Sequence, residues 1–257
     1  MREKLDQMEK QINNCKNCSQ SEHDFIELMR DSYKEAISLI YKARYKAYYT
    51  AANNMQYYLN GEGGTKIETL DYLRNFGAFN NADTRLNSYI QNLVEAKAES
   101  MKSGEKAVFR TEVWDAEVSP WPLNELYYSS GTSLLKGRAV VSIIKSDNSF
   151  TADVTVYKTW MDTYDWHKGL GVDRMVSNIG DEGYFELQNV GAKDFEIRAY
   201  YTSSMRYEVG PVAKHAVRMP IYFVNEPRWG SPKNYTSEKT PSHPDRTVAG
   251  DASTNTY

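Results

Sequence analysis

The chain has 257 residues, of which 40% are hydrophobic and 25% charged, a composition that excludes collagen, coiled-coil fibres and wholesale disorder. Its 31 basic and 34 acidic residues leave a formal net charge of -3, so we do not expect nucleic acid as a partner. The N-terminus is charged and no apolar run reaches about eighteen residues. We therefore expect neither a transmembrane helix nor a classical signal peptide, and a cytoplasmic location in the producing cell. The chain is unusually rich in tyrosine, with 20 such residues.

Two cysteines lie close together near the N-terminus, Cys15 and Cys18, in a C-x-x-C pattern. A zinc site needs four ligands, and the sequence holds no second cysteine pair; the nearest histidine is His23. A redox dithiol normally follows a strand, whereas polar, helix-forming residues surround this pair. We expect solvent-facing thiols, with a local disulfide or a metal site shared between molecules as the alternatives.

A long amphipathic helix is predicted from about residue 21 to Gly61. Ser21 and Asp24 have the spacing of a capping box at its start, and Gly61 supplies a C-cap at its end. Between them, apolar residues recur at intervals of three and four: Phe25, Met29, Tyr33, Ala36, Ile40, Ala43, Ala47, Ala51, Met55 and Tyr58. Such a helix would be roughly 55 Å long. We expect it to pack among comparable helices or to project from the body, and to offer a surface for oligomer formation.

The second half of this helix is rich in tyrosine and in basic residues. The candidate binding residues there are Tyr41, Tyr45, Tyr48 and Tyr49, interleaved with Lys42, Arg44 and Lys46. An aromatic and basic face suits a lipid headgroup boundary or a protein partner. The simpler interpretation is a core helix that buries the rings and keeps the hydroxyls wet.

Secondary-structure patterning changes class at Gly104. Before it, we predict a weak helix over residues 1–19, a short helix over 65–77, a polar turn at 80–83 and a helix over 84–102. After it, alternation of β-branched and aromatic residues predicts strands. The predicted strands cover residues 108–114 and 134–144, a hairpin over 138–160 with its turn at 147–149, then 195–201, 205–209 and 217–224.

Residues 226–257 hold four of the eight prolines and almost no apolar residues, so we expect a disordered or extended tail. The expected organisation is a helical region (1–103), a β-rich region (104–225) and this tail. The fold class is α+β, with an N-terminal long-helix bundle segregated from a mostly antiparallel, sandwich-like β region.

The densest cluster of reactive side chains lies at residues 160–169. Asp165 and His167 share one face of an extended chain and are the candidate acid–base pair, supported by Asp162 or Tyr164. A triad needs a nucleophile that the sequence does not identify, and none of the patterns G-x-S-x-G, H-E-x-x-H, Walker A or G-x-G-x-x-G occurs. The structural alternative is a corner in which the aromatic rings anchor the hairpin.

Metal-ligating residues are dispersed. Histidines occur only at positions 23, 167, 215 and 243, so we expect no multi-histidine centre. Asp181, Glu182 and Glu186 lack the alternation of an EF-hand loop, and a solvated acidic turn is the simpler interpretation. We expect no metal and no cofactor.

Three short stretches carry a resemblance to a family. They are NNMQYYLNGEGG at residues 53–64, TYDWHK at 163–168 and NVGAKDFEI at 189–197. Together, over residues 45–201, the chain resembles a module of uncharacterised bacterial proteins associated with contractile secretion systems and Rhs-type polymorphic toxins. In that module a helix ending in Leu-x-Gly-x-Gly precedes a β region with a Tyr-Asp-aromatic signature and a Gly-Ala-x-x-Phe-x-Ile strand. The resemblance implies a bacterial or phage setting and export without a classical signal, and it assigns no catalytic residue.

These observations favour a non-enzymatic effector or accessory protein, a toxin component being one form of it. We expect it to bind a protein partner or a membrane surface through the tyrosine-rich helix. The alternative is a hydrolase-type effector that uses the cluster between Asp162 and His167.

Overall fold

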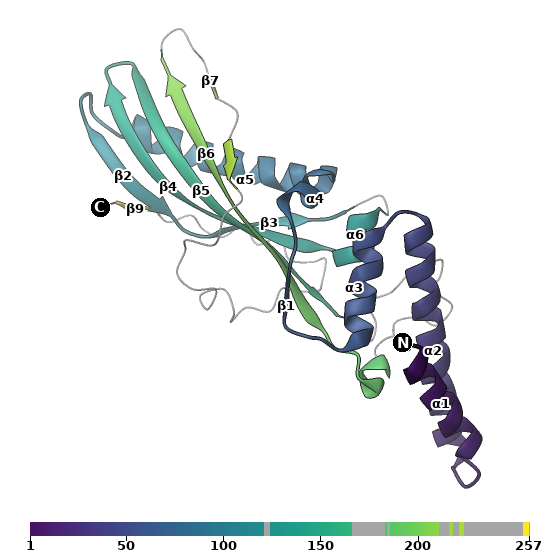
Figure 1. The fold of residues 1–257 in the computed structure, drawn as a ribbon. Coiled ribbons are helices and arrows are strands. Elements are labelled where there is room, and N and C mark those ends of the chain that lie inside the picture. The colour runs from purple at the N-terminus through teal and green to yellow at the C-terminus, as the bar shows by residue number, and fades with distance from the viewer. Residues whose placement is uncertain are drawn as a thin grey trace. The chain divides into compact units, whose positions relative to one another are not determined.

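The computed structural model describes residues 1–120, 124–165, 183 and 186–210, together with the backbone of 216–217, 221–223 and 254–256. The fold is α+β, with N-terminal helices followed by a sheet (Figure 1). The chain divides into two compact units, each built from separated stretches. The first unit comprises Met1–Lys66, Pro122–Gly131 and Thr163–Ile197, and the second comprises Ile67–Trp121, Thr132–Asp162 and Arg198–Tyr257. Gly104 therefore marks a change of secondary structure within the second unit.

The first unit is mainly helical. Its elements are α1 (Arg2–Asn14), α2 (Gln20–Tyr45), α3 (Tyr49–Asn60), α6 (Glu125–Ser130) and the 3-10 helix η1 (Leu187–Val190). Helix α1 lies against α2 (Figure 1), with Met8 buried and Lys34 of α2 3.0 Å from Glu9 of α1. The capping box of α2 is formed by Ser19 and Glu22, two residues before the predicted box, and the helix begins accordingly at Gln20.

The cysteine prediction is wrong. Cys15 and Cys18 form a disulfide in the connection between α1 and α2, so the local disulfide and not a pair of free thiols is observed. The turn that follows Asn14 brings the two Cα atoms to 5.2 Å, which is within the reach of a disulfide. The sulfur atoms are therefore not open to a metal ion.

The predicted long helix is interrupted at residues 46–48. Helix α2 ends at Tyr45, and α3 starts at Tyr49 and packs against α2. Two backbone hydrogen bonds end α2: Tyr48 N–H donates to the carbonyl of Ala43 (2.8 Å), and Ala47 N–H donates to that of Arg44 (3.0 Å). This pair is the Schellman arrangement, in which the C′ residue adopts a left-handed conformation. Ala47 occupies that position with a φ of 60°.

The end of α3 follows the sequence prediction. Gly61 is the C-cap, with a left-handed φ of 68°. It also lies so close to Gly191 that a Cβ at position 61 would be 2.0 Å from the carbonyl oxygen of Gly191. Lys193 N–H donates to the carbonyl of Tyr58 (3.1 Å) next to this contact. Gly61 is thus required both for its dihedral angle and for its small size.

The second unit is built on a sheet with the strand order β1-β6-β5-β4-β2-β9, and β3 also pairs with β4. The strands are β1 (Thr65–Ile67), β2 (Lys106–Thr111), β3 (Trp114–Val118), β4 (Ser133–Ser146), β5 (Ser149–Tyr164), β6 (Phe195–Val209), β7 (Ala216–Val217), β8 (Ile221–Phe223) and β9 (Thr254–Thr256). The first two residues of β1, the last two of β5 and the first three of β6 belong to the first unit. Within the predicted tail, β9 pairs antiparallel with β2, and the rest of residues 226–257 lies outside the described chain.

The predicted hairpin is confirmed and is longer than expected. Strands β4 and β5 pair antiparallel from Leu134 opposite Met161 to Ser146 opposite Ser149. Alternation places Val154, Val156 and Lys158 on the buried face. The strands expected at 195–201 and 205–209 are a single strand, β6, because no turn residue interrupts them.

Helix α5 (Gly77–Glu99) covers one face of the sheet, packing on β3 and β4 (Figure 1). Leu86 sits over Gly137, where a Cβ would come within 2.4 Å of its side chain, and Tyr89 stacks on Trp114 at 4.9 Å. The helix starts seven residues earlier than predicted, so residues 80–83 are helical and not a turn. The described strands form one sheet, and a helix instead of a second sheet buries this face.

The predicted helix over residues 65–77 is shorter than expected. Residues 65–67 form strand β1, and the helix is limited to α4 (Leu70–Arg74), which Thr69 caps by accepting a hydrogen bond from Tyr72 N–H at 3.2 Å.

A charged group lies inside the core of the second unit. The Lys158 ammonium is 2.6 Å from the Asp83 carboxylate and donates to the Asn87 amide oxygen at 2.7 Å. The Tyr201 hydroxyl also donates to Asp83, at 3.0 Å. Burial lowers the pKa of Lys158, and the adjacent Asp83 charge opposes that shift. This network explains why Asp83, read as a turn residue, is buried in a helix.

We expect Asp83→Ala to lower the free energy of unfolding by about 3–5 kcal/mol, because the buried Lys158 ammonium loses its counter-charge. The double variant Asp83→Leu/Lys158→Met should recover much of this loss. Urea unfolding measures both. The control is Asp153→Ala, which breaks the exposed pair with Arg206 and should cost under about 1 kcal/mol. An Asp83→Ala protein as stable as the parent would contradict this account.

We expect Gly61→Ala to lower the free energy of unfolding by at least about 2 kcal/mol, from the left-handed dihedral and from the clash with Gly191. Gly64→Ala is the matched control, because Gly64 has a φ of +76° with open space around its Cβ position. Thermal unfolding should show the larger loss for Gly61→Ala. Equal losses would mean that the close approach contributes nothing.

Candidate functional site: a tyrosine-lined pocket

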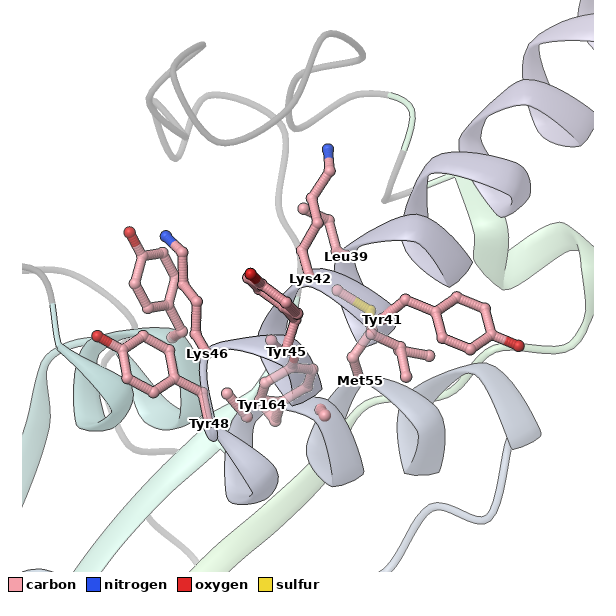
Figure 2. A pocket seen from close by; sticks show the side chains of 13 residues that line it. Leu39, Tyr41, Lys42, Tyr45, Lys46, Tyr48, Met55 and Tyr164 are labelled. Atoms are coloured by element: carbon pink, nitrogen blue, oxygen red, sulfur yellow. The ribbon is translucent and has the colours of Figure 1, made fainter.

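The first unit contains a pocket of about 520 Å³ where α2 gives way to α3 (Figure 2). Its volume is within the roughly 300–1,000 Å³ typical of ligand sites. Its described lining residues are Leu39, Ile40, Tyr41, Lys42, Ala43, Tyr45, Lys46, Tyr48, Ala51, Ala52, Met55, Tyr128 and Tyr164. The interruption of the helix at Ala47 thus lies at the pocket itself.

Three of the four candidate binding tyrosines line this pocket: Tyr41, Tyr45 and Tyr48. Tyr45 is 93% exposed and Tyr41 65% exposed, so these rings are not core residues. Tyr49 is also exposed but is not among the described lining residues. The interpretation of this stretch as a buried core helix is therefore wrong for Tyr41 and Tyr45, because the residues of α2 that are buried, among them Tyr33, Ala36 and Ile40, lie on another face of the helix.

The floor of the pocket is apolar and rigidly supported. Ile40, Ala52 and Met55 are buried, as is Tyr164, the last residue of β5. The Tyr164 ring stacks on Phe195 with centroids 5.1 Å apart and lies 6.0 Å from the Tyr58 ring. Aromatic contacts of this kind fix ring orientation. The floor is therefore formed before any ligand arrives.

One wall comes from α6, which the sequence analysis missed. Tyr128 stacks on Tyr48 at 6.0 Å, and Glu125 accepts a hydrogen bond from Thr50 N–H at 2.7 Å at the start of α3. Asn54 donates to the Ser129 carbonyl at 2.7 Å. A local signal was present, since Asn124 caps α6 and Gly131 ends it. The helix has only six residues, which is too short for periodicity to reveal.

The rim of the pocket is basic. Lys42 and Lys46 extend from α2 with Tyr45 between them in the view of Figure 2. Lys42 is 3.4 Å from Glu35, and Arg44 nearby donates to Gln56 at 2.8 Å. No acidic residue occurs in the sequence between Glu35 and Glu62. Among the lining residues that the structure describes, the charged ones are the two lysines.

The hydroxyl of Tyr58, a residue behind the floor, stays protonated near neutral pH. Burial raises the pKa of its hydroxyl, and the charges of Asp194 and Asp165 raise it further, against the effect of a hydrogen bond with Gln188. The pocket therefore offers rings, hydroxyls and ammonium groups, which are groups suited to binding.

The candidate acid–base cluster is only partly described. Asp162 and Tyr164 are buried and Asp165 is half-buried, while His167 lies outside the described residues. Tyr164 belongs to the aromatic floor, as the structural alternative for this cluster expects of an anchoring ring. The acidic residues Asp181 and Glu182 and the histidines at 215 and 243 also lie outside the described chain.

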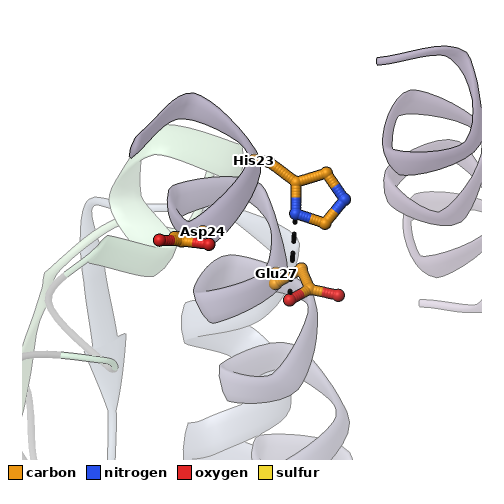
Figure 3. Close-up of side chains that lie close together, drawn as sticks. All are labelled: His23, Asp24 and Glu27. Atoms are coloured by element: carbon orange, nitrogen blue, oxygen red, sulfur yellow. Dashed lines mark ion pairs between the residues drawn. The ribbon is translucent and has the colours of Figure 1, made fainter. Parts of the chain in front are cut away.

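A second group of polar side chains lies on the first turns of α2 (Figure 3). The ligand atoms of His23, Asp24 and Glu27 are within 4.8 Å of one another, and His23 Nδ1 is 3.9 Å from a Glu27 oxygen. In Figure 3 the ion pair joins His23 and Glu27 and does not include Asp24. Asp24 already accepts a hydrogen bond from Gln20 at 2.7 Å. His23 and Glu27 are half-buried and Asp24 is exposed, and the group has the character of a helix-surface ion pair.

None of the described helices is both long enough and apolar enough to cross a membrane. Comparison of the chain with protein-family models, curated proteins and solved structures found no match.

We expect Ala47→Gly to raise the free energy of unfolding by about 0.5–1 kcal/mol, because glycine adopts the left-handed conformation without strain. Ala43→Gly, four residues earlier in regular helix, is the control and should lower it by a similar amount. Thermal unfolding gives both values. The same sign for the two substitutions would rule out a strained turn at Ala47.

Proposed function

We propose that this protein is a non-enzymatic effector or accessory protein that binds a protein partner through the tyrosine-lined pocket. The observation that carries the proposal is that Tyr41, Tyr45 and Tyr48 line a pocket with an apolar floor, with the ring of Tyr45 almost fully exposed. Tyrosine is enriched at protein interfaces because it supplies a large, stiff ring and a hydroxyl that tolerates water. A soluble protein that exposes several such rings at one concavity has a surface suited to a partner.

A protein partner fits this site better than a membrane surface does. Helices that lie in the lipid interface present a continuous apolar stripe along their length. Here the turn at Ala47 interrupts that stripe, and the exposed rings surround a bounded pocket. The resemblance in residues 45–201 supports a bacterial or phage setting and export without a classical signal peptide as parts of the same proposal.

The test uses the immobilised full chain and an extract of the organism that encodes it. Proteins captured by the parent and by Tyr49→Ala should be lost with Tyr45→Ala, as measured by quantitative mass spectrometry. Tyr49 is the control because it is a neighbouring exposed tyrosine outside the described pocket lining. Thermal unfolding of each variant verifies that the fold is retained.

Two results would contradict the proposal. One is partner capture that is unchanged by Tyr45→Ala. The other is sedimentation of the parent with vesicles of phosphatidylglycerol and phosphatidylethanolamine that Tyr45→Ala abolishes, without any pocket-dependent protein capture. The second result would assign the pocket to a membrane surface.

A further inference from the structure

We propose that the pocket recognises a partner segment in which a large apolar side chain stands next to acidic residues. This inference rests on the proposed function and specifies the chemistry of the partner. It combines two features of the site, namely an apolar floor and a basic rim, that act on neighbouring groups of the same ligand.

The floor selects for a large apolar side chain. Ala51 and Ala52 keep the space above α3 clear because their side chains are small, and Ile40 and Met55 supply apolar contact. The Tyr164 ring, 7% exposed and stacked on Phe195, closes the bottom. An aromatic or leucine side chain inserted there would be surrounded by apolar atoms, while a short polar one would leave the cavity unfilled.

The rim selects for negative charge. Lys42, in the last turn of α2, and Lys46, the C-cap residue of that helix, are exposed at the pocket. Lys42 has Glu35 at 3.4 Å, so Lys46 is the cation better placed to take a new carboxylate. A basic segment would meet the positive stretch that runs from Lys42 to Lys46. Cations at the C-terminal end of α2 also stabilise the helix through its dipole, and this structural role requires no ligand.

The occupant is a protein segment and not a lipid. An acyl chain needs an apolar channel along its length, whereas the described floor is a short patch ringed by tyrosine hydroxyls and lysines. Tyrosine hydroxyls can instead hydrogen-bond the backbone of a bound segment while their rings pack on its side chains. Charge complementarity then defines the residues that flank the anchor.

The experiment measures peptide binding to the full chain by calorimetry, with NMR titration for weak affinities. The probe is an eight-residue Gly/Ser peptide with a central Glu-Trp-Glu, and its two controls carry Lys-Trp-Lys or Glu-Ser-Glu. We expect both controls to bind at least about tenfold more weakly than the probe. Lys42→Glu/Lys46→Glu should weaken binding of the probe about tenfold, and 0.5 M salt should reduce the contribution of charge.

Variants separate this inference from the proposed function. Tyr45→Ala should abolish binding of the probe, and Tyr49→Ala should leave it at the parent value. If partner capture depends on Tyr45 but the Glu-Trp-Glu and Lys-Trp-Lys peptides bind equally, or the charge reversal has no effect, the inference is wrong and the proposed function stands. If neither partner capture nor peptide binding responds to Tyr45→Ala, both are wrong. The helix-dipole role alone predicts that charge reversal changes only thermal stability.

Discussion

The reversal of the chain at Ala47 is the constraint on which the candidate site depends. Two backbone hydrogen bonds close this turn, and they require a left-handed residue that alanine adopts only at a cost. Without the turn, α2 and α3 would be one straight helix, and Tyr41, Tyr45 and Tyr48 would follow one another along its surface. With it, the three residues line a concavity at the junction of α2 and α3. Backbone strain next to a binding site is a recurring association in proteins, since strain persists where the surroundings over-determine the conformation.

Lysine has opposite roles in the two units, and the environment decides which. Lys158 is buried among Asp83, Asn87 and Tyr201, which satisfy its charge and hydrogen bonds, so it orders a core and has no capacity left for a ligand. Lys46 lies exposed on the pocket rim of the first unit, where its charge is available to a partner. A buried cation must be paired because the interior solvates it poorly, whereas an exposed one is stabilised by water and can exchange that water for a carboxylate.

The pocket combines a preformed floor with a rim of exposed side chains. Stacking of Tyr164 on Phe195 and of Tyr48 on Tyr128 fixes the rings that define its shape. A site that is already ordered loses little conformational entropy when it binds, so even modest contacts contribute to affinity. The short helix α6 matters for this reason, because it holds the start of α3 through Glu125 and supplies one wall.

The sequence by itself determined the fold class, the β4–β5 hairpin and the C-cap at Gly61, because each is encoded in local patterning or in turn residues. It also singled out Tyr41, Tyr45 and Tyr48 by composition, and their role in binding stays a prediction. Only the tertiary structure decided where the long helix breaks. The left-handed residue at the break is Ala47, whereas this position is usually glycine, which the sequence would have revealed. The tertiary structure likewise decided the disulfide, the helical state of residues 80–83 and the wall from α6. These features depend on contacts between residues distant in sequence, or on turns too short for any periodicity to reveal.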